Sequence, residues 1–277
     1  MHNPIIGFTN GYKGIKLYHK SYIAKENQER IILLHGAGEY SEKYTRFAEW
    51  FIAKGIDVYL LDLRGHGRSG GPRCHVDDFN NYAQDVDIFI RFTESEYGFK
   101  NTFLVSHSIG GLIAIYYGLN FKHQLGGIVV SSPCLALKLN IDPVKVWFAG
   151  LFYRFLKDRQ FASHIDFKMV THDDYMIKRF KDDPMIYHFV TAGFYAQMVK
   201  AMKYVNSRAA DLKLPLLILQ AGDDRICRRE AAEDFYQRAG SIDKEFKLYE
   251  GFYHEVLNET ERERVFEDIY TWIKKRC

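Results

Sequence analysis

The sequence is poor in cysteine, in charge of one sign and in long hydrophobic runs. Its four cysteines, Cys74, Cys134, Cys227 and Cys277, are scattered without CxxC spacing, so we expect neither a disulfide scaffold nor a metal site. No stretch reaches the ~20 apolar residues that a spanning helix requires, and residues 1–12 lack the pattern of a secretory signal. These absences favour a cytoplasmic protein, free or bound peripherally to a membrane.

Charge excludes a further class of function. The chain has 38 basic and 35 acidic side chains, and no block of five or six like charges occurs, so nucleic-acid binding gains no support. A chain of 277 residues buries roughly 75% of its extended surface and needs no disulfide or metal to be stable. One large domain, or one domain with an inserted module, is expected.

Short apolar runs alternate with segments of helical period through the first half of the chain. Runs without polar alternation predict strands that are buried on both faces, as in parallel sheets covered by helices. The predicted strands are residues 30–34, 56–61, 102–105 and 127–130. Apolar spacing predicts helices between positions 44 and 52, ending before Gly55 as a C′ glycine, and between positions 79 and 89. The pattern is that of an α/β protein.

The alternation stops after Pro133 and returns after about Val205. The intervening residues show helical periods and polar turns but no convincing strand. Strands are then predicted at 215–220 and 245–249, with a helix between them and a closing helix through residues 265–273. We therefore predict a core made of residues 1–132 and 206–277, interrupted by a helical insertion at 133–205.

A predicted strand, a turn of small residues and an apolar helix surround Ser108. Residues 102–105 run into Ser106-His107-Ser108-Ile109-Gly110-Gly111, the context in which a serine stands at the apex of a nucleophile elbow. Small residues two positions before and after the serine permit the sharp turn, and the helix N-terminus supplies N–H groups to an oxyanion. Ser106 stands where the usual GxSxG pattern has glycine, and its small side chain is expected to fit.

Two further predicted strand ends carry an acid and a histidine. Residues 215–220 open into a loop with Asp223 and Asp224, and residues 245–249 open into a loop with His254. A serine hydroxyl needs a base to take its proton and a carboxylate to orient that base. The order serine, acid, histidine is that of α/β-hydrolases, and all three residues follow strand ends, where sites of parallel sheets form.

On these motifs the chain resembles the α/β-hydrolase superfamily, and within it the monoacylglycerol lipase and lysophospholipase group. The resembling stretches cover most of the chain: His35-Gly36-Ala37-Gly38-Glu39-Tyr40-Ser41, Asp62-Leu63-Arg64-Gly65-His66-Gly67-Arg68-Ser69, residues 106–111, residues 222–226 and Glu250-Gly251-Phe252-Tyr253-His254. The resemblance implies an α/β-hydrolase fold, a mostly parallel central sheet flanked by helices. It also implies that residues 133–205 form a helical cap over an acyl-chain pocket.

The resemblance implies the remaining parts of the site. It favours Asp224 over Asp223 as the acid, because the position before Arg225 matches the family. The oxyanion hole is expected from the backbone N–H groups of Ala37 and Ile109. Glu39 and Lys43 match family positions near the head-group end of the pocket, and solvated charges explain them equally well. No cofactor is implied.

Three other histidines are assigned structural roles. His35 and His66 lie in glycine-rich turns, where hydrogen bonding to the backbone is the simpler role. His107 is expected to pack under the elbow, facing the wrong way to serve as the base. Cys227 lies three residues after Asp224, and nothing indicates that it is the nucleophile.

These observations lead to the hypothesis of a serine hydrolase that cleaves carboxylic esters of lipophilic acyl chains. Ser108 is the nucleophile, His254 the base and Asp224 the orienting acid. Monoacylglycerol is the first choice of substrate, followed by lysophospholipid or a general carboxylic ester. A peptidase or C–C bond hydrolase, and a catalytically silent module that binds lipid or protein, are the alternatives, since fold alone does not fix function.

One segment of the predicted cap has the composition of a membrane-contacting helix. Residues 144–156 hold an uncharged aromatic stretch, bracketed by Lys145 and Arg154, that is too short to span a bilayer. Because one helical face cannot bury every aromatic ring, we expect some of Trp147, Phe148, Leu151 and Phe152 to be exposed and to contact the membrane interface. Packing inside the domain or against a second subunit is the alternative.

Overall fold

The computed structural model of the chain describes residues 3–24, 27–138, 157–163 and 165–277. The segment on which peripheral membrane contact is predicted, residues 144–156 with Trp147 and Phe148, lies outside the described residues. That prediction stays a prediction.

Most strands of the described residues form one eight-stranded sheet with the order β1-β2-β4-β3-β5-β6-β9-β10. The six strands β4, β3, β5, β6, β9 and β10 are parallel to one another, whereas β1 and β2 add antiparallel strands at the β4 edge. The mostly parallel sheet predicted from the sequence is therefore confirmed. The strand bounds are β1 Ile5–Asn10, β2 Lys16–Tyr22, β3 Glu29–Leu34, β4 Asp57–Leu61, β5 Asn101–His107, β6 Gly127–Ser131, β9 Leu216–Ala221 and β10 Lys244–Tyr249.

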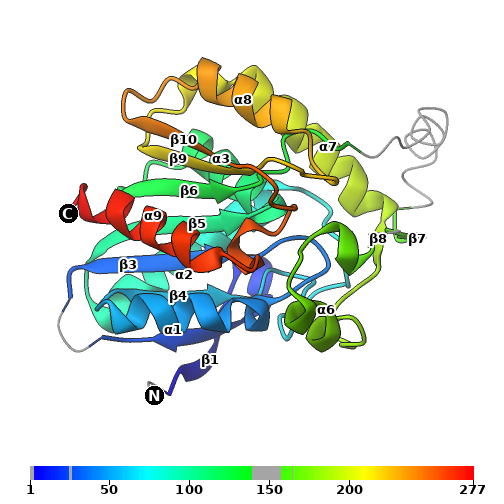
Figure 1. Cartoon of the computed structure of the whole chain (residues 1–277). Helices are drawn as coiled ribbons and strands as arrows, with labels where there is room; N and C mark the ends of the chain where they lie inside the picture. Colours follow the sequence, from blue (N-terminus) through cyan, green and yellow to red (C-terminus); the bar gives the residue numbers. More distant parts are fainter. Residues whose placement is uncertain (1–2, 25–26, 139–156, 164) are drawn as a thin grey trace.

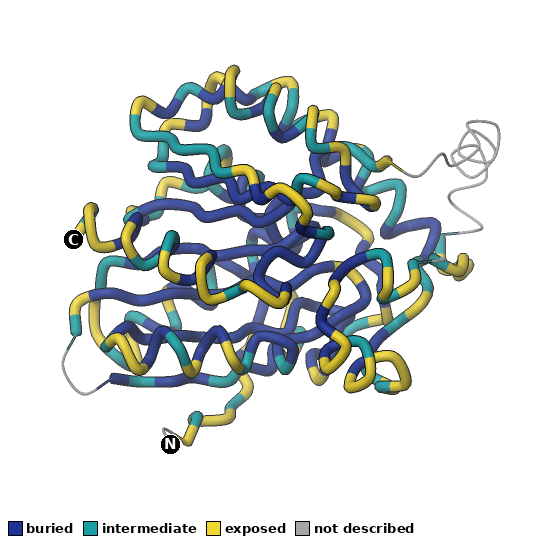
Figure 2. Tube along the Cα trace, in the orientation of Figure 1, coloured by how far each residue is buried: buried dark blue, intermediate teal, exposed yellow. Residues whose placement is uncertain are grey.

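Helices cover both faces of this sheet (Figure 1). Helices α1 (Thr45–Ala53) and α9 (Arg262–Lys274) pack on one face, and α2 (Asn80–Tyr97), α3 (Ile109–Asn120) and α8 (Arg229–Arg238) on the other. The inner strands β3, β4, β5, β6 and β9 are buried along nearly their whole length, while exposed residues follow the outer sides of the helices (Figure 2). Two apolar clusters result, one on each face, and each fully buried Leu, Ile or Phe adds about 1.5–3 kcal/mol.

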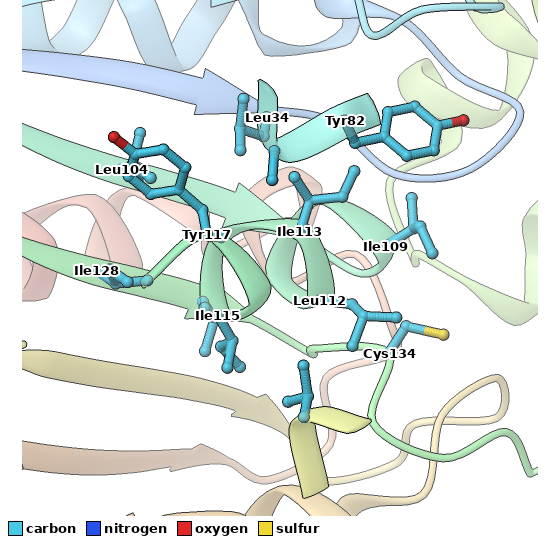
Figure 3. Packing of buried hydrophobic residues seen from close by; sticks show 14 of the residues in the cluster. Leu34, Tyr82, Leu104, Ile109, Leu112, Ile113, Ile115, Tyr117, Ile128 and Cys134 are labelled. Atoms are coloured by element: carbon cyan, nitrogen blue, oxygen red, sulfur yellow. The ribbon is translucent and has the colours of Figure 1, made fainter. Parts of the chain in front are cut away.

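Helix α3 is buried on most of its sides by the sheet and the neighbouring helices. Ile109, Leu112 and Ile113 on this helix are at most 1% exposed, and Figure 3 shows them among side chains of β3, β5 and β6. Such all-round burial fixes the position of the residue that precedes the helix, Ser108.

Helix α1 shows how the sequence pattern becomes structure. Phe47, Ala48, Phe51 and Ile52 are buried on one side of it. The chain then turns at Gly55, whose φ of 81° suits glycine because it has no Cβ. The Gly55 N–H donates to the Ile52 carbonyl at 3.0 Å, so the predicted C′ glycine is confirmed.

The segment between β6 and β9 contains more than helices. The strands β7 (Gln160–Ala162) and β8 (Phe189–Thr191) form an antiparallel pair, so the prediction of no strand in this region is wrong. Three-residue strands are too short for periodicity to reveal. Its described residues also form η3 (Phe167–Met169), α6 (Asp174–Phe180) and α7 (Ala192–Ser207). Helix α7 begins beside β8 and packs on α3 (Figure 1).

The N-terminal strands β1 and β2 were not predicted either. Ile5, Ile6 and Phe8 of β1 are half exposed, because β1 is an edge strand whose polar and apolar residues do not separate by face. The remaining single-turn helices of the described residues are η1 (Tyr12–Gly14), η2 (Ser41–Tyr44), η4 (Ala209–Asp211) and η5 (Val256–Asn258). None of the helices in the described part of the chain is both long and apolar enough to cross a bilayer.

Candidate active site

Ser108 joins the end of β5 to the start of α3 with a strained backbone. Its φ is 53° and its ψ is −115°, a conformation that costs a non-glycine residue about 1–3 kcal/mol. The surroundings hold it there: the Ser108 N–H donates to the Ser131 carbonyl at 2.9 Å, and the Ser108 carbonyl accepts from the Cys134 N–H at 3.0 Å. The predicted strand-turn-helix elbow is thus present, with Ser108 at its apex.

Small residues make this turn fit. A Cβ added to Gly110 would lie 2.3 Å from the Leu34 carbonyl oxygen, so α3 can approach the end of β3 this closely only with glycine at that position. Ser106 is buried in β5 and its hydroxyl donates to the Val129 carbonyl at 3.0 Å. The serine that replaces the first glycine of the usual pattern is therefore accommodated by a hydrogen bond inside the sheet.

Asp224 and His254 lie together at the carboxyl ends of β9 and β10. His254 Nδ1 is 2.8 Å from Asp224 Oδ2. The other oxygen, Oδ1, accepts the backbone N–H groups of Ile226 and Cys227, each at 2.9 Å. Both Asp224 and His254 are buried, whereas the neighbouring Asp223 is exposed. Of the two adjacent acids, Asp224 is the one paired with the histidine.

This pairing sets the charge of both side chains. Burial opposes the charged form of His254, but the carboxylate of Asp224 outweighs it and raises the pKa of His254. Burial likewise opposes ionisation of Asp224, yet His254 and the two backbone donors hold its pKa below the usual range. The aspartate is therefore ionised at neutral pH, and the Nδ1 of His254 is the nitrogen that carries a proton toward it.

Two residues whose backbone amides were predicted to form the oxyanion hole lie near the cavity of Ser108. Ile109 N–H is the first of α3 and Ala37 N–H lies in the loop after β3; both residues line the same cavity as Ser108. Neither amide has a hydrogen-bond partner among the described residues. The loop of Ala37 bends at Gly38, which has a φ of 74° and whose carbonyl accepts the Tyr187 N–H at 2.7 Å.

Glu39, Lys43 and Glu255 form a buried group that we call the ion cluster. The Lys43 ammonium donates to Glu39 Oε2 and to Glu255 Oε1, each at 2.5 Å, and the three side chains are 7% exposed or less. Glu39 Oε1 also accepts the Gly36 N–H at 2.5 Å and the Tyr44 hydroxyl at 2.6 Å. The sequence did not reveal Glu255, although it follows His254 directly.

The pKa values of the two carboxyls in the ion cluster are shifted in opposite directions. Burial opposes ionisation of Glu39, but the Lys43 ammonium holds the pKa of that carboxyl far below its usual range. Burial raises the pKa of Glu255, and Lys43 offsets only part of that effect. Two carboxyls share one ammonium, so the ion cluster contains no cation without an acidic partner.

A cavity of about 890 Å³ connects these groups. Its lining includes Ser108, His254, Ala37, Ile109, Glu39 and Lys43, all singled out in the sequence, and also Glu255. Asp224 is not part of the lining and contacts His254. The remaining lining is mostly apolar and comes largely from the segment between β6 and β9: Phe161, Ile165, Phe167, Val170, Ile186, Val190, Phe194, Tyr195, Met198 and Val199. Size and lining suit a lipophilic chain.

The three other histidines considered in the sequence, His35, His66 and His107, are held by hydrogen bonds to the backbone or by packing. His35 Nδ1 faces the Gly36 carbonyl at 2.7 Å and its Nε2 accepts the Leu63 N–H at 2.9 Å. His66 Nδ1 faces the Arg64 carbonyl at 3.0 Å. The ring of His107 packs against that of His254 with centroids 4.7 Å apart. Burial lowers the pKa of His66 and of His107 to about 3, so both are neutral.

The remaining reactive side chains do not suggest another centre. Cys74, Cys134 and Cys227 are buried and Cys277 is exposed, and none is in a disulfide. The thiol of Cys227 has a pKa well above its usual range, through its contact with Cys134 and its burial, so it is a poor nucleophile. Within the described ranges, no group of three or more His, Cys, Asp or Glu side chains could hold a metal ion.

Comparison with known proteins decides the family. Residues 25–261 match the Hydrolase_4 family, described as serine aminopeptidase, S33. The chain belongs to this α/β-hydrolase family. The resemblance seen in the sequence motifs is confirmed.

Relatives of this α/β-hydrolase are named as lipid-cleaving enzymes. The monoacylglycerol lipase of Mycolicibacterium smegmatis is 31% identical over 88% of this chain and 87% of its own. The phospholipase YtpA of Bacillus subtilis is 30% identical over 85% of this chain and 91% of its own. The crystal structure of the monoacylglycerol lipase of Paleococcus ferrophilus superposes with a TM-score of 0.86 at 26% identity, covering 94% of this chain and 99% of that one. Family and relatives support a lipolytic hydrolase.

Proposed function

We propose that this α/β-hydrolase is a serine hydrolase that cleaves monoacylglycerol. The observation that supports this most is the shared cavity: the strained Ser108 and His254, which is paired with Asp224, line one largely apolar chamber large enough for an acyl chain. Ser108, Asp224 and His254 form the catalytic triad in this proposal, and the amides of Ala37 and Ile109 form the oxyanion hole.

The proposed chemistry follows the acyl-transfer sequence. His254 takes the proton of the Ser108 hydroxyl as its oxygen bonds to the ester carbonyl carbon, and the carbonyl oxygen becomes an oxyanion. The Ala37 and Ile109 amides donate to this oxyanion, each worth about 3–4 kcal/mol in the transition state. The tetrahedral intermediate expels the alcohol, which leaves with the proton from His254. Water, deprotonated by His254, then releases the fatty acid from Ser108.

The ion cluster forms a polar part of the cavity wall, and its charge favours a substrate with a neutral head group. Lys43 is the cation nearest this part of the cavity, and it is already bonded to two carboxylates. A phosphate placed there would meet Glu39 and Glu255 without an unpaired cation, whereas glycerol hydroxyls can both donate to carboxylates and accept from the ammonium. We propose that Glu39 and Lys43 contact the glycerol of a monoacylglycerol.

Lysophospholipid is the second candidate, and two lysines favour it. Lys200 and Lys203 of α7 line the cavity and are exposed, with no ion pair to another described residue. An anionic head group at this rim would gain their charge. Replacement of both lysines by glutamine is expected to lower kcat/KM for an anionic lysophospholipid and to leave that for monoacylglycerol unchanged if this second candidate is right.

We propose further that residues 133–205 act as the cap of the cavity. Its described part supplies most of the apolar lining, and the Tyr187 amide bonds to the Gly38 carbonyl next to the proposed oxyanion hole. Substrate selectivity is therefore expected to change with side chains of this segment more than with those of the core.

The test has two steps. A fluorophosphonate probe is expected to label the wild type and Ser106→Ala but not Ser108→Ala; equal labelling of Ser108→Ala would refute the nucleophile, and no labelling of the wild type would favour a silent binding module. A panel of monoacylglycerols, lysophospholipids, short p-nitrophenyl esters and aminoacyl amides then ranks the substrates by kcat/KM. We expect monoacylglycerol first and aminoacyl amides last, and the reverse order would favour a peptidase.

A further inference from the structure

The ion cluster joins two loops that the proposed reaction uses for different purposes. Glu39 belongs to the loop after β3, which carries the Ala37 amide. Glu255 follows His254 in the loop after β10. Lys43 sits between them and donates to one carboxylate of each loop at 2.5 Å. The two loops are far apart in sequence, and the strands that precede them, β3 and β10, are not neighbours in the sheet.

Each end of the ion cluster continues into the backbone of its loop. Glu39 Oε1 accepts the Gly36 N–H, which fixes the peptide immediately before Ala37. At the other end, Glu255 Oε2 accepts the Asn258 side-chain amide at 3.1 Å, and the Glu255 N–H donates to the Val170 carbonyl at 2.8 Å. Every one of these atoms lies in a largely buried setting, where a charge-assisted hydrogen bond is stronger and more directional than in water.

A chain of hydrogen bonds therefore connects the loop after β3, which carries the Ala37 amide, to the loop after β10, which carries His254. We propose that Lys43 and Glu255 are positioning residues, which hold the Ala37 amide and the His254 imidazole at the separation that the tetrahedral intermediate requires. This inference rests on the proposed serine hydrolase function and adds to it a role for Glu255, which does not touch the reacting atoms.

Charge supports the same assignment. Glu39, Glu255 and Asp224 surround His254 with acidic groups, while Lys43 is the cation of the set and His107 and His35 are held neutral by burial. Glu255 raises the pKa of His254 after the larger effects of burial and Asp224. Removing its charge is therefore expected to move the pH profile of the base as well as the geometry of the loop.

The variants are Glu255→Gln and Glu255→Asp. Glutamine keeps the shape and can still accept from Lys43, but as a neutral acceptor it leaves the ammonium drawn toward Glu39. Aspartate keeps the charge but is one methylene too short to reach Lys43 at the same backbone position. We expect either change to lower kcat for a soluble ester by about tenfold to hundredfold, less than the ~10²–10³-fold loss on removal of an oxyanion donor, with KM changed less than threefold.

A transition-state analogue separates positioning from a merely structural role. A trifluoromethyl ketone places an oxyanion in the hole, so its inhibition constant is expected to rise in proportion to the fall in kcat/KM across the variants. Glu255→Gln is also expected to shift the acid limb of the kcat/KM profile to lower pH.

Asp57→Asn is the matched control. Asp57 is another buried carboxylate that accepts from a lysine, Lys100, at 2.6 Å, but it begins β4 at the opposite end of the sheet. It is expected to lower the melting temperature while leaving the inhibition constant and the pH profile unchanged. Unchanged kcat and inhibition constants in both Glu255 variants would overturn the positioning role, while labelling of Ser108 in the same proteins keeps the proposed hydrolase function separate from that outcome.

Discussion

Replacement of Asp224 by asparagine is the sharpest test of the proposed triad. The two oxygens of this carboxylate have different partners: Oδ1 accepts two backbone N–H groups at 2.9 Å, and Oδ2 faces His254 Nδ1 at 2.8 Å. Because the backbone donors demand an acceptor, the amide oxygen of the asparagine must take the Oδ1 position. Its NH₂ group then faces His254.

The consequence is the wrong tautomer of His254. An NH₂ donor opposite Nδ1 turns that nitrogen into an acceptor, so the proton moves to Nε2, which can no longer take the proton of Ser108. Gln220 accommodates the change, since its Nε2 donates to Asp224 Oδ2 at 3.3 Å while its Oε1 is buried without a partner; a flipped Gln220 amide would accept from the new NH₂. The fold is therefore expected to lose little stability.

The expected loss of activity is large. The equivalent change in a characterised triad lowers kcat about 10⁴-fold, which corresponds to roughly 5 kcal/mol of transition-state stabilisation. The assay is steady-state hydrolysis of a soluble short-chain ester, together with thermal unfolding of each variant. Asp223→Asn is the control, and because Asp223 is exposed we expect it to change kcat less than threefold.

Equal losses in the two variants, or the larger loss in Asp223→Asn, would refute the assignment of the acid. A fall in melting temperature large enough to unfold Asp224→Asn at the assay temperature would instead refute the argument that Gln220 compensates.

Three further outcomes are expected. The pKa of His254 is raised, and only its neutral form accepts a proton, so kcat/KM for a neutral ester should fall as the pH falls. The midpoint of this pH profile is expected above 6.5, the usual pKa of histidine. A midpoint below 6 would contradict the pairing with Asp224. Gly110→Ala should abolish activity, because its Cβ meets a backbone carbonyl at 2.3 Å, whereas Gly55→Ala, with open space around it, should cost only about 1–2 kcal/mol of stability and no activity. Phe47→Ala should lower the free energy of unfolding by about 3–5 kcal/mol without changing kcat at temperatures where the protein is folded, as measured by denaturant titration beside the ester assay.

The sequence was most informative where one local pattern determines the structure. Buried parallel strands have unbroken apolar runs in their sequence. The runs that end at Leu34 and Leu61 coincide with the ends of β3 and β4. Ser108 was found because an elbow needs a strand, small residues and a helix in immediate succession. The edge strand β1 and the three-residue strands β7 and β8 carry too few buried positions for such a pattern.

Partners that are distant in the chain were beyond sequence reasoning. Glu255 and Gln220 contact the proposed site through side-chain hydrogen bonds to Lys43 and Asp224, and no spacing rule predicts these contacts. The choice between Asp223 and Asp224 shows the same limit: the residues alone supplied two adjacent carboxylates, and the resemblance favoured one. What separates them physically is the direction of each side chain at a strand end, which only the folded backbone sets.

The hydrogen bond between the Tyr187 amide and the Gly38 carbonyl connects the segment before β8 to the loop of the proposed oxyanion hole. Tyr187 lines the cavity in the segment before β8, and Gly38 follows Ala37 directly. A ligand that pushes the Tyr187 segment outward must stretch this bond and so displace the loop of the proposed oxyanion hole, whereas a chain that fills the cavity without moving the segment leaves the hole intact. Acyl chains of different lengths are therefore expected to differ in kcat and not only in KM, because the far end of the chain helps to determine how well the carbonyl end is held.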